Sequence, residues 1–151
     1  MKIILTGSLL VSLVFSGGLR EAEKTIQKYI DKHMEEAIGL IEKVVNINSG
    51  TLNIDGNKTV GKIFQAELDK LGFNTYWVTY PETIKRSGHL FAEMRGGKGK
   101  KIVLIGHLDT VFELDHPFQK FTRVGNTAYG PGVSDMKAGD VSMIYAMKAL
   151  E

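Results

Sequence analysis

Cysteine is absent from this 151-residue chain, and its absence sets the first limits on what the protein can be. Without cysteine there can be no disulfide framework and no thiolate zinc site, so any metal ion must be held by His, Asp and Glu. A strong excess of one charge is also missing. The formal net charge is only +2, and the basic residues form no stripe with interleaved aromatics, so nucleic acid is not expected as a partner.

What the chain contains is the mixture of an ordinary globular domain, with 43% hydrophobic and 24% charged residues. This composition excludes a disordered or fibrous protein, and the length is sufficient for one domain with a hydrophobic core. The sequence shows neither an internal repeat nor a low-complexity tract.

The longest apolar run lies at the N-terminus, where Lys2 is followed by IILTGSLLVSLVF and then by the small residues of positions 16–18. The run is too short to span a bilayer, and charged residues follow from Arg20. A first core strand or a membrane anchor is the alternative. The pattern predicts a secretory signal peptide over residues 1–18, which would leave residues 19–151 secreted or periplasmic without a stable membrane anchor.

Hydrophobic periodicity predicts the elements of residues 19–151. Apolar residues at three- and four-residue steps indicate amphipathic helices, and Asn-, Gly- and Ser-rich stretches indicate loops. The expected order is a helix over 19–45, a loop over 46–58, a helix from Val60 that stops at Gly72, strands over 73–80, 89–96 and 102–106, a hairpin over 121–130 around Gly125 and Asn126, and a final helix over 141–151.

The segment IVLIG, residues 102–106, is apolar at every position and is therefore expected to be a strand buried on both faces. A sheet that contains such a strand needs cover on both sides, and helices are expected to provide it. The fold class predicted from the residues is therefore α/β.

His107 and Asp109 follow directly after this predicted strand. Residues at positions i and i+2 of a strand face the same side, and ligands of open α/β sheets bind at the carboxyl ends of strands. A neutral imidazole binds zinc well, and a carboxylate that accepts its other N–H orients it. The alternative is a strand end with a satisfied histidine and a turn aspartate.

A second candidate site lies in YGPGVSDMKAGD, residues 129–140, where a Gly-Pro-Gly loop brings Asp135 to the start of a predicted helix. The free backbone N–H groups of a helix N-terminus stabilise a carboxylate as an anion, which leaves it available to a cation. The alternative is that Ser134 or Asp135 serves only as the helix N-cap.

Together, GHLDTVF at 106–112 and YGPGVSDMKAGD resemble the motifs of the co-catalytic zinc exopeptidase family that includes aminoacylase, acetylornithine deacetylase and the glutamate carboxypeptidases. NINSGT and LGFNT are similar to its glutamate carboxypeptidase branch. The resemblance covers the chain from about Leu19 to its end. It implies the N-terminal part of an α/β catalytic domain, with a mixed sheet flanked by helices and incomplete at the C-terminus.

The resemblance also implies a role for each residue. His107 would be a zinc ligand, Asp135 would bridge two zinc ions and precede a cis peptide bond to Met136, and Asp109 would be the catalytic-site carboxylate that steers His107. Cobalt or manganese would suit the same ligand types. The implied reaction is metal-dependent hydrolysis of a peptide or amide bond in a small peptide or N-acyl amino acid, and a complete family member can be a homodimer.

The chain departs from the family pattern by an absence. A Glu-Glu pair some thirty-odd residues after the bridging aspartate, and the later acidic and His ligands, have no counterpart before Glu151. The chain alone is therefore predicted to be inactive. The alternative function is a non-catalytic α/β binding or structural module that retains only the motif residues.

Overall fold

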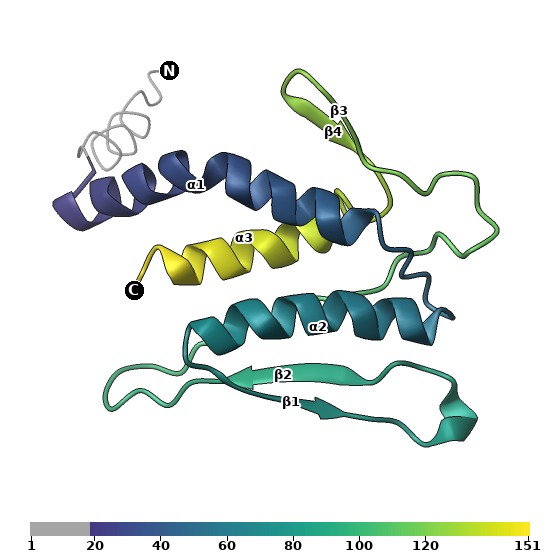
Figure 1. Cartoon of the computed structure of the whole chain (residues 1–151). Helices are drawn as coiled ribbons and strands as arrows, with labels where there is room; N and C mark the ends of the chain where they lie inside the picture. The colour runs from purple at the N-terminus through teal and green to yellow at the C-terminus, as the bar shows by residue number, and fades with distance from the viewer. Residues whose placement is uncertain (1–18) are drawn as a thin grey trace, which may run out of the picture.

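The computed structural model describes residues 19–151 (Figure 1), and the predicted signal peptide lies outside this range. Within it, no helix is long and apolar enough to cross a membrane. The elements are the helices α1 (Glu21–Val45), α2 (Ile54–Lys70) and α3 (Lys137–Lys148), the short 3₁₀ helix η1 (Glu82–Ile84), and the strands β1 (Asn74–Val78), β2 (His89–Glu93), β3 (Thr122–Val124) and β4 (Thr127–Tyr129).

The three long helices form one layer, with α3 lying between α1 and α2 (Figure 1). Their facing stripes bury one core cluster, because the apolar residues recur at helical spacing on each of them. Glu21 and Glu23 in the first turn of α1 and Lys43 in its last turn match the helix dipole. The core cluster contains Val44, Val60, Phe64, Val141, Ile144 and Tyr145.

The strands β1 and β2 pair antiparallel in a hairpin that packs on α2 (Figure 1). Alternate residues of both strands are half-buried, and the other face is exposed, with Tyr76 stacked on Phe91 across the pair. The strands β3 and β4 form a second hairpin with a two-residue turn. Gly125 stands first in that turn with φ of 57°, which is the position where a type II′ turn requires glycine.

Gly61 allows α2 and the β1–β2 hairpin to approach closely, since a Cβ atom at this position would lie 2.5 Å from Cζ2 of Trp77. We expect Gly61→Ala to lower the free energy of unfolding by about 1–3 kcal/mol, because the added methyl overpacks the contact. Gly39 in α1 has nothing within 4 Å of its ideal Cβ, so Gly39→Ala is the matched control and should raise stability by about 0.4–1 kcal/mol. Urea denaturation of both variants tests this. Equal effects of the same sign would contradict it.

The buried strand predicted at 102–106 is not formed. The segment is extended and in no sheet, and Ile102, Val103 and Ile105 are 82%, 78% and 83% exposed. A strand needs hydrogen-bonded neighbours and covered faces, and the described residues provide neither here. The observed sheets are two antiparallel pairs, and the one parallel pairing in residues 19–151 is an isolated bridge between Gly50 and Thr110.

Several predicted boundaries are also corrected. The strands predicted over 73–80 and 89–96 are shorter, at Asn74–Val78 and His89–Glu93. The loop over 46–58 ends earlier, because the Asn53 side chain accepts a hydrogen bond from Gly56 N and starts α2 at Ile54. The last helix runs from Lys137 to Lys148 rather than over 141–151. The stop at Gly72 is confirmed, since this residue has φ of 77° directly after the C-cap of α2. The chain is thus a mixed α/β fold with a continuous helical layer and small sheets.

Candidate functional site

His107 and Asp135 lie side by side although they come from different parts of the chain. His107 directly follows the segment 102–106, and Asp135 lies in the turn that precedes α3. The distance from Nε2 of His107 to Oδ1 of Asp135 is 2.8 Å. They share an open cleft of about 430 Å³ that is lined by Thr51, His107, Asp109, Thr110, Val111, Phe112, Phe118, Gly130, Gly132, Ser134 and Asp135.

Asp135 does not cap α3. The N-cap is Met136, which makes no side-chain capping bond, and the Asp135 carboxylate is 86% exposed and accepts from the His107 ring. The peptide bond from Asp135 to Met136 is cis, as the family resemblance implied. Capping, the alternative suggested for Ser134 or Asp135, therefore does not describe this carboxylate, which is exposed and paired with His107 instead.

Asp109 lies at the other edge of the His107 ring. Its backbone carbonyl accepts from Nδ1 at 3.0 Å, and Oδ1 of its carboxylate lies 3.4 Å from the same nitrogen. The backbone carbonyl thus fixes Nδ1 as the protonated nitrogen, and the carboxylate adds a negative charge beside it. Nε2 is thereby turned toward Asp135.

The two ring nitrogens of His107 each face an acceptor. Partial burial lowers the pKa of His107, but the hydrogen bonds to Asp135 and Asp109 and the charges of both carboxylates outweigh it and raise the pKa above its ordinary value. A protonated ring donates to both groups. The same Nε2 and carboxylate oxygens have the chemistry to hold a metal cation in place of the Nε2 proton.

The donor types therefore fit zinc, but the number of donors does not complete a site. Residues 19–151 contain no cluster of three or more His, Asp or Glu side chains able to hold one metal ion. Structural zinc sites have four protein ligands and catalytic ones usually three. His107 and Asp135 supply two, and Asp109 is turned toward the Nδ1 edge of the ring.

Lys137 and Asp140 are features of the site region that the sequence interpretation missed. Lys137 is fully buried, and its Nζ donates to the carbonyls of Val44 and Ile47, which ties the turn after Asp135 to the end of α1. Burial lowers the pKa of Lys137 to about 8. The helical period of α3, followed back from Val141, places both charged residues on the buried face and could have revealed them.

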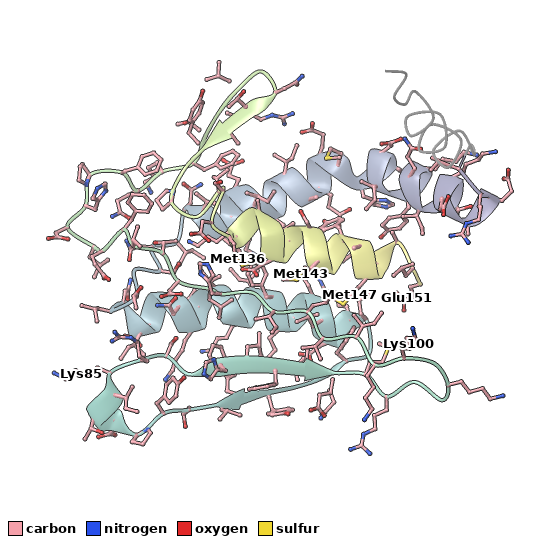
Figure 2. The ribbon with its side chains drawn as sticks, turned by 180° about the vertical axis from the view of Figure 1, so that it is seen from behind. Lys85, Lys100, Met136, Met143, Met147 and Glu151 are labelled. Carbon is pink, nitrogen blue, oxygen red and sulfur yellow. The ribbon has the colours of Figure 1, made fainter. Side chains whose placement is uncertain are left out.

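Asp140 is 7% exposed, and its Oδ2 atom has no hydrogen-bond partner. Burial raises the pKa of Asp140 to about 7, against the lowering effect of the positive charges of His107 and Lys137. Oδ1 lies against Gly106, where a Cβ atom would collide with it. Figure 2 shows Met136, Met143 and Met147 along the side of α3 that faces α2, and the methyl group of Met143 also packs near Gly106.

The other three histidines do not line this cleft. His33 stacks on Tyr29 within α1, and His89 contacts Tyr80 beside the β1–β2 hairpin. His116 accepts a hydrogen bond from the backbone N–H of Phe118. Each is engaged in a local contact, and His107 is the one histidine that faces a carboxylate across the cleft.

Two comparisons with known proteins find related sequences. Residues 103–151, which include His107 and Asp135, match the sequence model of peptidase family M20/M25/M40. This match confirms the family resemblance that the two motifs predicted. The chain is 33% identical over 115 residues to carboxypeptidase G2 from Pseudomonas sp. (strain RS-16). That alignment covers 76% of this chain and 28% of the relative, so the chain spans less than a third of that protein's length.

Proposed function

We propose that this chain is part of a secreted or periplasmic zinc carboxypeptidase of the glutamate carboxypeptidase type, which hydrolyses a small peptide or an N-acyl amino acid. The observation that carries the proposal is the 2.8 Å approach of His107 Nε2 to the Asp135 carboxylate across a cleft, with Asp135 not used as a helix cap. The match of residues 103–151 to the peptidase family model supports it.

In this proposal, His107 and Asp135 are metal ligands. A pair of zinc ions, when bound, would polarise the scissile carbonyl and activate water, and cobalt or manganese could do the same. The Asp135 carboxylate has two oxygens to share between two cations. His107 presents Nε2 because Nδ1 donates to the Asp109 carbonyl, and the Asp109 carboxylate stabilises positive charge on the ring.

The remaining ligands and the general base are proposed to come from parts of the complete polypeptide outside this sequence. Three observations support this. The chain spans 28% of carboxypeptidase G2, the described residues supply two ligands, and the apolar segment 102–105 has no cover among them. Further strands of the catalytic domain would cover that segment and complete the sheet.

The test is to compare variants of the complete polypeptide in the release of C-terminal glutamate from an N-acyl-glutamate, together with their zinc content. We expect His107→Ala and Asp135→Asn to lose bound zinc and to reduce turnover by more than the roughly 10–100-fold loss that follows removal of an outer partner of a ligand. His89→Ala, on the β1–β2 hairpin, is the control and should retain both.

Two outcomes would contradict this proposal. If His107→Ala left zinc content and turnover unchanged, the proposed metal site would be refuted. Zinc bound through His107 without turnover of any acyl amino acid would instead favour the non-catalytic binding module.

A further inference from the structure

The loop that joins α1 to α2 packs against the segment that carries Asp109. This loop, residues 46–53, runs alongside residues 108–113 and is hydrogen-bonded to them through its backbone. Thr110 N donates to Ser49 O at 2.8 Å, and Thr51 N donates to Thr110 O at 3.0 Å. Neither Ser49 nor Thr110 is more than 5% exposed, so the pairing is protected from water. The two segments therefore form one rigid support under the cleft.

Side chains strengthen this support on both sides of Thr51. The Ser49 hydroxyl donates to the carbonyl of Leu108 at 2.8 Å. The buried Asn57 amide donates to Gly50 O at 2.8 Å, and so fixes the loop to the first turn of α2. At Gly50 the approach to Glu113 is so close that a Cβ atom would collide with it. The contacts of the neighbouring residues thus fix the position of Thr51, independently of the contacts that its own side chain makes.

From this fixed position the Thr51 hydroxyl donates to Oδ2 of Asp109 at 2.6 Å. The other carboxylate oxygen, Oδ1, is the one that lies 3.4 Å from Nδ1 of His107. A hydrogen bond to one oxygen of the carboxylate holds the Asp109 side chain in one χ1 rotamer, because another rotamer would break that bond. The hydroxyl therefore keeps the carboxylate charge beside the imidazole.

We propose that Thr51 is a positioning residue that acts on His107 through Asp109. Its hydroxyl holds the Asp109 carboxylate with Oδ1 beside Nδ1, which keeps a negative charge at that edge of the ring and makes Nε2 a better ligand. The proposal rests on the metal-ligand role of His107 proposed above. The backbone carbonyl of Asp109 already fixes the tautomer, so the contribution of Thr51 is the orientation of the carboxylate charge.

The first arm of the test needs no metal. In the metal-free 151-residue chain, three-bond couplings to the Asp109 carboxyl carbon report whether this side chain occupies one rotamer. We expect one rotamer in the wild type and in Thr51→Ser, which keeps the hydroxyl, and averaging in Thr51→Val, which keeps the shape without it. Thr59→Val is the matched control, since Thr59 donates to a backbone carbonyl on the exposed face of α2. A single Asp109 rotamer in Thr51→Val would overturn the proposal.

The second arm measures the affinity of the same chains for Zn²⁺ alone by calorimetry. Thr51→Val should weaken binding about tenfold, the lower part of the range for outer partners of a metal-bound histidine, and Thr51→Ser should restore it. In an Asp109→Ala background, Thr51→Val should cause no further loss, because its effect passes through Asp109. An equal loss in both backgrounds would overturn the proposal. Wild-type affinity unchanged by His107→Ala would instead refute the metal site, while the coupling measurements still decide the role of Thr51.

Discussion

Supplied with excess zinc, the purified 151-residue chain is expected to release no C-terminal glutamate from an N-acyl-glutamate at an enzymatic rate. The described residues offer His107 and Asp135 as ligands, and no third ligating side chain joins them. Two ligands shared between two ions should bind weakly, in competition with water. Among residues 19–151, the carboxylates that line the cleft are Asp109 and Asp135, and Asp109 is turned toward His107, so we expect no general base there. The lack of a positioned base alone costs a factor of about 10²–10⁴ in rate.

The measurement combines a turnover assay with zinc stoichiometry, because weak binding and absent catalysis are separate consequences of the incomplete ligand set. His107→Ala provides the baseline for both. Tight binding of two zinc ions by the wild-type chain, with turnover abolished by His107→Ala, would contradict the prediction. In that case the missing ligands would have to come from a second copy of the chain, and the dependence of turnover on protein concentration would reveal it.

The sequence predicted some elements of the fold and not others, depending on whether their signals are local or distant along the chain. Elements with local signals were predicted well. The periodic apolar face of α1, the stop at Gly72 and the turn at Gly125 all depend on residues within a few positions of one another. The segment 102–106 depends on distant neighbours, because a strand exists only where other strands pair with it. Its composition is that of a buried strand, but the described residues contain no partner for it.

The residues of the candidate site show the same difference between local and distant signals. His107, Asp109 and Asp135 were predicted because two short motifs carry them, and the structure brings them to one cleft, while their roles stay a proposal. Their supports could not be found in this way. Thr51 is far from Asp109 in sequence, and Lys137 reaches back across the fold to the end of α1. Such contacts depend on which segments meet in space, and only the helical period of α3 gave a local indication of one of them.

Asp140 provides a second large effect, on stability rather than on activity. Burial raises the pKa of this carboxyl from an ordinary 3.8 to about 7, because Oδ2 has no partner and the group is sheltered from water. A carboxyl whose pKa is raised by folding contributes fully to stability below pH 4. That contribution is lost as the pH rises through about 7, because the unfolded chain then holds the charge more favourably. The loss amounts to up to about 4 kcal/mol.

We therefore expect Asp140→Asn, which keeps the size of the side chain but carries no charge, to be about as stable as the wild type at pH 4 and on the order of 2–4 kcal/mol more stable at pH 8. The comparison is read between pH 4 and 7, where Lys137 stays charged and most of the loss is already expressed, because Lys137 has its pKa lowered to about 8 and this pKa also depends on the charge of Asp140. His107 is common to both proteins, so its titration largely cancels in the difference. Urea denaturation from pH 4 to pH 8 measures the effect, and Asp31→Asn on the exposed side of α1 is the control for the Asp-to-Asn exchange itself. A gain from Asp140→Asn that is the same at every pH would contradict this prediction and would mean that a partner stabilises the buried carboxyl. A wild type that is more stable than the variant at pH 8 would also contradict it, and would mean that the charge of Asp140 helps to hold α3 against Gly106.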